Sequence, residues 1–133
     1  MIDKKIEKVA VIGSGLIGSS WATLFGRWGY KVNIYDIKKK QLESSKKKVN
    51  NNLNSCLRNG VYSDKEVKDT LNNISYFDNL ELAVKDVQFI QECSFDNIEV
   101  KRNIIAEIDK YNTTAIISSS TSALNISDIS RDS

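Results

Sequence analysis

Short apolar segments and longer amphipathic segments alternate along the chain. Residues 6–12 are almost continuously apolar, which is typical of a strand that is buried on both faces of a parallel sheet. Residues 31–36 alternate between polar and apolar positions and predict a second strand. The five strands that the pattern predicts span residues 6–12, 31–36, 73–77, 87–92 and 114–118.

Between these runs, apolar residues recur with helical spacing. The first such segment, residues 16–28, carries Trp21 and Trp28 seven positions apart, and this spacing assigns both to the core. Residues 63–66 form a capping-box pattern that predicts the start of a short helix. The five predicted helices span residues 16–28, 38–58, 63–71, 79–84 and 96–111. Because strands alternate with helices, we expect an α/β fold with a parallel sheet and right-handed crossovers.

The turn between the first strand and the first helix, residues 13–18, reads Gly-Ser-Gly-Leu-Ile-Gly. An acidic residue, Asp36, follows the second strand 18 positions after the last glycine. Strand, glycine turn, helix, second strand and acid together form the dinucleotide-binding fingerprint of Rossmann folds. The sequence therefore predicts a doubly wound parallel sheet of Rossmann type, with helices 38–58 and 63–71 inserted as a helical hairpin between strands two and three.

Each glycine of the turn has a physical reason to be there. Gly13 permits the tight turn, and the missing Cβ of Gly15 lets a pyrophosphate approach the backbone. Gly18 lets the helix pack closely on the strand. The free N–H groups at the start of that helix, and the positive end of its dipole, attract the phosphates.

Asp36 indicates which dinucleotide is bound. A carboxylate at this position accepts hydrogen bonds from the ribose hydroxyls and repels a 2′-phosphate, so we expect NAD as the cofactor rather than NADP. Residues 38–40 are three lysines that could neutralise a phosphate, but no arginine lies beside the acid. A flavin or another nucleotide remains an alternative ligand for the same turn.

Composition excludes several classes of function. The chain has 133 residues, which is enough for one domain, and its net charge of +2 implies no strong attraction to nucleic acid or to a membrane. It contains no histidine, which excludes histidine acid–base catalysis and ordinary histidine metal sites within these residues, and we expect no metal. Cys56 and Cys93 lack metal-site spacing and indicate a reduced, cytoplasmic protein.

Three segments together resemble the NAD-binding domain of the 3-hydroxyacyl-CoA dehydrogenase family: residues 9–36, residues 90–93 (Ile-Gln-Glu-Cys) and residues 116–122 (Ile-Ile-Ser-Ser-Ser-Thr-Ser). The resemblance covers essentially the whole chain and includes the paired helices. In detail it is similar to the λ-crystallin branch, the L-gulonate 3-dehydrogenases, through Tyr-Asp-Ile at 35–37 and the triple serine. Acyl-CoA members usually carry asparagine where this chain has Ser120.

The resemblance implies where the cofactor would lie. The backbone around Leu16 and Ile17 would hold the pyrophosphate, and Asp36 would bind the adenosine ribose. Asp96 and Lys101 would line the nicotinamide side. Without the resemblance, Asp96 is an anion at a helix start and Lys101 is a surface residue.

Ser122 is implied to contact substrate and cofactor near the reacting carbon. It follows a predicted strand, which places it in the crevice where open α/β sheets bind ligands. The alternative is an ordinary loop hydroxyl or a helix cap, and without a partner base it is not a nucleophile. Glu92, at the end of the fourth strand, either faces the site or has a structural role.

The family's general base is a histidine in a His-Pro-x-Asn-Pro segment, oriented by a glutamate. In the family both residues lie downstream of a serine loop like that at residues 118–122, beyond Ser133. We therefore expect residues 1–133 to be the N-terminal part of a longer dehydrogenase, without its C-terminal helical domain, that binds the cofactor but does not turn over. The resemblance implies that the full-length enzyme is a homodimer.

Three hypotheses for function follow. The first is the NAD-binding domain of a 3-hydroxyacyl-CoA dehydrogenase, which transfers hydride from a 3-hydroxy substrate to NAD and gives the 3-keto product. The second is L-gulonate 3-dehydrogenase or a related hydroxy-acid enzyme. The third, from another class, is a non-catalytic module that binds or senses NAD(H). Lysines at 38–40 and 46–48 either contact CoA phosphates or form a solvated helix face.

Overall fold

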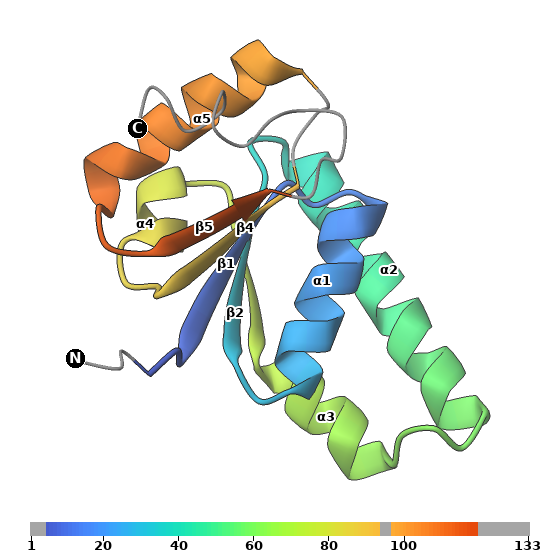
Figure 1. Cartoon of the computed structure of the whole chain (residues 1–133). Helices are drawn as coiled ribbons and strands as arrows, with labels where there is room; N and C mark the ends of the chain where they lie inside the picture. The colour runs from blue at the N-terminus through green and yellow to red at the C-terminus, as the bar shows by residue number, and fades with distance from the viewer. Residues whose placement is uncertain (1–4, 94–96, 120–133) are drawn as a thin grey trace.

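The computed structural model describes residues 5–93 and 97–119. Strands and helices alternate along the described chain, as the sequence predicted (Figure 1). The strands are β1 (Lys8–Ile12), β2 (Lys31–Tyr35), β3 (Ile74–Phe77), β4 (Phe89–Glu92) and β5 (Ile116–Ser119). The helices are α1 (Leu16–Arg27), α2 (Lys39–Arg58), α3 (Asp64–Asn72), α4 (Leu80–Val84) and α5 (Ile98–Tyr111).

The strands form one sheet in the order β3-β2-β1-β4-β5, and every neighbouring pair is parallel. Helices α1, α2 and α3 cover one face of the sheet, and α4 and α5 cover the other (Figure 1). The chain runs outward from β1 through β2 to β3, and then crosses to β4 and continues to β5 on the other side. This is the doubly wound Rossmann arrangement, and the α2–α3 hairpin lies between β2 and β3 as predicted.

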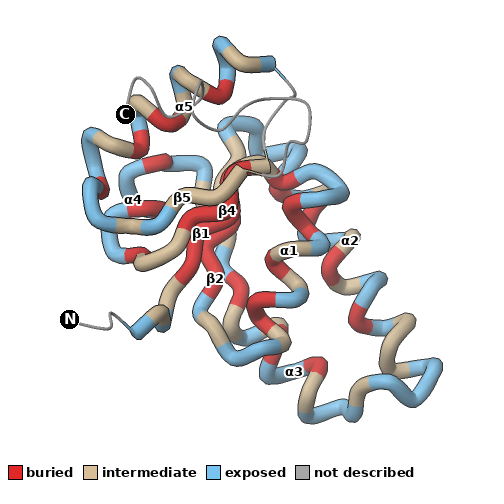
Figure 2. Tube along the Cα trace, viewed as in Figure 1, coloured by how far each residue is buried: buried red, intermediate tan, exposed pale blue. Residues whose placement is uncertain are grey.

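Alternate residues of the central strands pack into two separate hydrophobic cores, because successive side chains of a strand point to opposite faces of the sheet. Val9 and Val11 of β1 belong to the core under α1–α3, whereas Ala10 and Ile12 belong to the core under α4 and α5. All four are essentially inaccessible to solvent. Figure 2 shows buried residues running along the middle strands. The continuous apolar run of the first strand is therefore explained by burial on both faces.

Local signals set several element boundaries. Ser63 accepts a hydrogen bond from the Glu66 N–H while the Glu66 side chain accepts from the Ser63 N–H, which confirms the predicted capping box. Asn79 and Asn97 accept hydrogen bonds from first-turn N–H groups of α4 and α5 in the same way. Gly29, with φ of 97°, follows α1 in a conformation that favours glycine.

The prediction that both tryptophans of the first helix lie in the core is wrong for Trp28, which is 61% exposed. Trp21 is half-buried and stacks on Phe25, with ring centroids 5.5 Å apart. The face of α1 that meets the sheet is built mainly from small residues instead. A Cβ at Gly26 would lie 3.2 Å from Ile74 Cγ1, so helix and sheet approach too closely for a large side chain there.

Among the described residues, no helix combines the length and the apolar character that a membrane span requires.

Candidate functional site

A hollow of about 510 Å³ opens at the carboxyl ends of the central strands. It lies where the chain leaves β1 and β4 in opposite directions, which is the usual ligand position in open α/β sheets. The glycine turn, the end of β2 with the start of α2, and one side of α5 contribute its wall. Its lining residues are Ile12, Gly13, Ser14, Gly15, Tyr35, Asp36, Ile37, Lys38, Gln41, Cys93, Val100, Ile104 and Glu107.

The three glycines of the turn differ in their local surroundings. Gly13 has a φ of 98°, which side chains rarely tolerate. A Cβ at Gly18 would lie 1.9 Å from the Gly13 carbonyl oxygen, so only glycine lets α1 start this close to β1. A Cβ at Gly15 would meet no protein atom within 4 Å. The space above Gly15 is therefore open to a ligand.

Helix α1 begins directly at this open space. Its N-cap residue is Gly15, which has no side chain that could cap the helix. The first turn of the helix contains no acidic residue. The side chains of Leu16 and Ile17 are 68% and 57% exposed, so they do not close over the helix end. Backbone N–H groups and the positive end of the helix dipole are thus available to an anion such as a pyrophosphate.

Asp36 lies at the wall of the hollow, and backbone and hydroxyl donors hold its carboxylate. The N–H and the hydroxyl of Ser14 donate to Oδ2 at 3.1 and 2.8 Å, and the Lys38 N–H donates to Oδ1 at 3.1 Å. The Gly13 N–H donates to the Tyr35 carbonyl at 2.9 Å, which ties the glycine turn to the end of β2. The acid and the turn are therefore one assembled unit, as the fingerprint predicts.

Charges of both signs lie on the β2 side of the hollow, where Asp36 and Lys38 are among the lining residues. Burial raises the pKa of the Tyr35 hydroxyl, and the carboxylates of Glu107, Asp36 and Asp78 raise it further. The Tyr35 hydroxyl therefore keeps its proton to a higher pH than a free tyrosine does.

Sequence reasoning missed much of the lining. Ile37 is 75% exposed and Val100 is 38% exposed, and together with Ile104 they give the hollow its apolar walls. Gln41 and Glu107 add polar atoms from α2 and α5. The one available signal was the pair of isoleucines at 37 and 104, since Ile37 directly follows Asp36, the acid for which the sequence predicts ribose binding. The contribution of α5 depends on how the helix lies over the sheet.

Lys101 is not exposed toward the hollow. It is 1% exposed, and its Nζ lies 2.6 Å from Oε1 of Glu92, which is itself 0% exposed. The Ser119 hydroxyl donates to the same oxygen at 2.9 Å. Glu92 thus has the structural role that the sequence left open, and it joins β4, α5 and β5. The nicotinamide-side role of Lys101 stays a prediction.

Two other predicted site residues, Asp96 and Ser122, lie outside the described residues. The structure brings Gly13, Gly15 and Asp36 together around one hollow.

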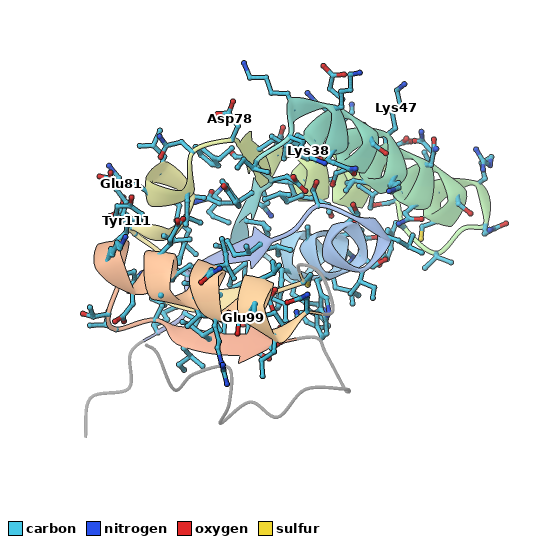
Figure 3. The ribbon with its side chains drawn as sticks, turned by 90° about the horizontal axis from the view of Figure 1, so that it is seen from above. Lys38, Lys47, Asp78, Glu81, Glu99 and Tyr111 are labelled. Carbon is cyan, nitrogen blue, oxygen red and sulfur yellow. The ribbon has the colours of Figure 1, made fainter. Side chains whose placement is uncertain are left out.

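The lysines of α2 and its start lie mostly on the solvent side. Lys39 pairs with Asp78 at 3.7 Å, and the ammonium of Lys46 lies 5.7 Å from the centre of the Tyr76 ring. Lys38 and Lys47 are exposed, and Figure 3 shows Lys47 pointing away from the body of the molecule. A solvated helix face accounts for this arrangement, and contact with CoA phosphates is untested.

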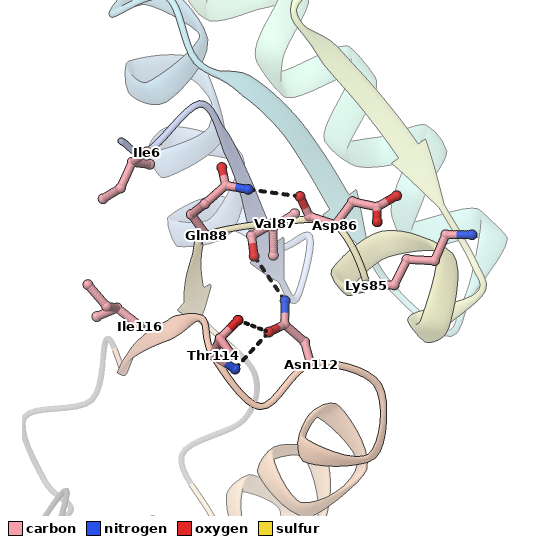
Figure 4. Close-up of a pocket in the computed structure, with 8 residues that line it drawn as sticks. All are labelled: Ile6, Lys85, Asp86, Val87, Gln88, Asn112, Thr114 and Ile116. Atoms are coloured by element: carbon pink, nitrogen blue, oxygen red, sulfur yellow. Dashed lines mark hydrogen bonds between the residues drawn. The ribbon is translucent and has the colours of Figure 1, made fainter. Parts of the chain in front are cut away.

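A second hollow, of about 390 Å³, lies at the opposite end of the sheet (Figure 4). Its central polar side chain, Asn112, donates to the carbonyls of Val84 and Val87 and accepts from the N–H groups of Thr114 and Ala115. These bonds fasten the loops before β4 and β5 to each other. We therefore assign this hollow to the fold and not to a ligand.

Comparisons with known proteins agree with this geometry. The family model of the 3-hydroxyacyl-CoA dehydrogenase, NAD binding domain, matches residues 8–133. A λ-crystallin homologue of Rattus norvegicus is 38% identical over 118 residues, which are 87% of this chain and 37% of the relative. A peroxisomal fatty acid beta-oxidation multifunctional protein of Arabidopsis thaliana is 32% identical over 130 residues, which are 97% of this chain and 18% of that protein.

A solved structure supports the fold independently. The crystal structure of (S)-3-hydroxybutyryl-CoA dehydrogenase from Ralstonia eutropha superimposes with a TM-score of 0.92 at 21% identity, covering 97% of this chain and 46% of that one.

The chain thus spans little more than a third of the length of the λ-crystallin homologue that it matches. The family model nevertheless covers β1 to β5, including the glycine turn and Asp36. The description of the family gives NAD as its cofactor. The chain belongs to the family of NAD-binding domains of 3-hydroxyacyl-CoA dehydrogenases.

Proposed function

We propose that this chain is the cofactor-binding part of an oxidoreductase that converts a 3-hydroxy substrate to the 3-keto product with NAD. The observation that carries the proposal is the joint position of Gly15 and Asp36. An open glycine backbone at the start of α1 and a fixed carboxylate at the end of β2 face the same hollow. These are the two features that a dinucleotide needs at a Rossmann switch point.

The residues present fit the adenosine half of NAD. The backbone at Gly15, Leu16 and Ile17 would hold the pyrophosphate, Asp36 would accept from the ribose, and Ile37 with Ile104 would contact the adenine. When bound, NAD supplies the hydride acceptor, and the protein supplies orientation and charge. Asp96, Lys101 and Ser122 complete the proposal on the nicotinamide and substrate side.

The test is a calorimetric titration of the protein with NADH and NADPH side by side. Saturable binding with a clear preference for NADH supports the proposal and the role of Asp36. Tighter binding of NADPH contradicts that role, and a flavin that binds in place of either nucleotide contradicts the proposed cofactor.

The substrate of the whole protein is proposed in two forms. A 3-hydroxyacyl-CoA follows from the family that matches residues 8–133. A small hydroxy acid such as L-gulonate is favoured by the 38% identity to a λ-crystallin homologue and by the serine at position 120. Assay of the full-length protein with both substrates separates them, and turnover of neither would favour the non-catalytic NAD(H)-binding module.

Location and assembly are further parts of the proposal. We place the protein in the cytoplasm because two isolated cysteines without metal-site spacing, Cys56 and Cys93, are typical of a protein in a reducing compartment. Fluorescence microscopy of the tagged full-length protein tests this, with the peroxisome as the alternative that the plant relative's name provides. We also propose that the full-length protein is a homodimer, which light scattering measures.

A further inference from the structure

The orientation of Asp36 is fixed by the residue between the first two glycines, Ser14. Both the backbone N–H and the hydroxyl of Ser14 donate to Oδ2 of Asp36, at 3.1 and 2.8 Å. Ser14 is 0% exposed, whereas Asp36 is partly exposed at the wall of the hollow. Two buried donors of Ser14 therefore bind Oδ2 of Asp36. The other oxygen, Oδ1, accepts a hydrogen bond from the backbone N–H of Lys38.

Ser14 is itself held in place by two helices. The Ser19 hydroxyl, on α1, donates to the Ser14 carbonyl at 3.1 Å, and it lies 2.7 Å from the hydroxyl of Ser45 on α2. Because a hydroxyl has one hydrogen and Ser19 gives it to Ser14, Ser45 is the donor in the second bond. All three serines are fully buried. The donor pair on Asp36 is thus part of a chain of hydroxyls that begins on α2.

These bonds occupy most of the acceptor capacity of Asp36. An ionised carboxylate offers about four acceptor positions, and Ser14 and Lys38 fill three of them. The position that is left is on Oδ1, so the direction in which the carboxylate can meet a ribose hydroxyl is set before the ligand arrives. Preorganisation of this kind lowers the entropy lost on binding.

Three lysines follow Asp36 closely in the chain, at positions 38–40, and Lys38 also lines the hollow. Lys38 and Lys40 are exposed, and Lys39 is paired with Asp78. If the carboxylate rotated away from the ribose position, the cation of Lys38 at the same hollow would favour a 2′-phosphate. A carboxylate that cannot rotate repels the phosphate.

We propose that Ser14 is a positioning residue that determines the preference for NAD over NADP, because its hydroxyl holds Asp36 in the orientation that accepts a ribose hydroxyl and repels a 2′-phosphate. This inference rests on the proposed function, in which Asp36 binds the ribose. It assigns to the serine between the glycines a role in specificity in addition to its place in the turn.

The test compares four proteins: the unchanged chain, Ser14→Ala, Asp36→Ala and the double variant. Each is titrated with NADH and with NADPH. We expect Ser14→Ala to weaken NADH binding about three- to tenfold, while NADPH binding stays the same or tightens. The ratio of NADH affinity to NADPH affinity should therefore fall. In the Asp36→Ala background, Ser14→Ala should change NADH binding no further, because the two residues act as one unit.

The matched control is Ser20→Ala, at a serine of α1, the helix that follows Ser14. The Ser20 hydroxyl is exposed and donates to the Leu16 carbonyl at 2.9 Å, so its loss should leave both affinities unchanged. Thermal unfolding of every variant is measured in parallel. Ser14→Gly, which keeps the backbone N–H and removes the hydroxyl, should show the same fall in this affinity ratio as Ser14→Ala.

Three outcomes overturn the inference: unchanged NADH affinity in Ser14→Ala, equal weakening of NADH and NADPH, or loss of folding in both Ser14 variants. The last two would give Ser14 a purely structural role. If Asp36→Ala leaves NADH binding unchanged, the ribose role of Asp36 fails, and with it the proposed function. The two failures are therefore distinguishable in one set of titrations.

Discussion

Glu92 and Lys101 form an ion pair inside the protein, with Nζ 2.6 Å from Oε1 and side chains that are 0% and 1% exposed. Glu92 ends β4, and Lys101 lies in the first turns of α5. Water cannot screen the pair, so the two charges interact strongly at this distance. The pair joins α5, which lines the hollow beside the glycine turn, to β4.

We therefore expect Lys101→Met to destabilise the protein by about 3–5 kcal/mol, because the buried Glu92 carboxylate loses its ion pair with Lys101. Urea unfolding measures the loss. The double variant Glu92→Met/Lys101→Met removes both charges and should recover most of the lost stability. Lys110→Met, at an exposed position of the same helix, is the control and should be nearly neutral. A single variant as stable as the unchanged protein would contradict this account.

Replacement by alanine should have different effects at Gly15 and at Gly18. Gly18→Ala places a Cβ where the Gly13 carbonyl oxygen lies, so we expect a clear loss of thermal stability. Gly15→Ala meets no protein atom, and its φ of −69° suits alanine, so stability should change by about 1 kcal/mol or less. NADH binding should nevertheless weaken by about tenfold or more, because the methyl group occupies the path of the pyrophosphate. Unimpaired NADH binding by Gly15→Ala would place the phosphates elsewhere.

Asp36→Ala should weaken NADH binding by about 1–3 kcal/mol, the range for hydrogen bonds to a charged group. Calorimetry measures the change. The control is Asp78→Ala, which removes an exposed carboxylate that pairs with Lys39 near the same helix start but does not line the hollow. Equal losses in the two variants would mean that general charge, and not contact with the ribose, controls binding.

Tyr76 should make the protein sensitive to alkali. Burial raises the pKa of its hydroxyl from 10.0 to about 12. Between these pH values the Tyr76 hydroxyl has lost its proton in the unfolded chain but still holds it in the folded protein. The free energy of unfolding is therefore unaffected by this group below pH 10, and it falls as the pH rises toward 12. Because the ring is only partly buried, solvent screening reduces the loss to about 1 kcal/mol.

Urea unfolding of the unchanged protein and of Tyr76→Phe at pH values across this window tests the effect. Tyr76→Phe keeps the ring near Lys46 and should show a smaller loss of stability as the pH rises. Parallel losses in the two proteins would assign the alkaline sensitivity to other groups.

Several features of the fold and site were predictable because their causes are local. The continuous apolar run of β1 reflects burial on both faces, and it was visible in the sequence. The glycine turn was predictable because a φ of 98° at Gly13 and the contact at Gly18 exclude side chains. Asp36 was found by its spacing from that turn, since β2 has to reach the same edge of the sheet as β1.

Other features depended on which faces meet in three dimensions. Trp28 has the spacing of a core residue but lies exposed, because α1 packs on the sheet through small residues such as Ala22 and Gly26. Helical spacing shows that one face is apolar, but it does not show how near the helix comes to the sheet.

The sequence by itself thus determined the order of strands and helices along the chain, the glycine turn and the place of Asp36 beside it, because each depends on residues close in the chain. Only the tertiary structure decided which side chains pair with one another across different elements. Lys101 occupies the buried face of α5 that includes Ile105 and Ile108, and no local pattern indicates that Glu92 compensates its charge. Likewise, Ser14, Ser19 and Ser45 are ordinary hydroxyl residues until packing of α1 and α2 joins them to one another and to Asp36.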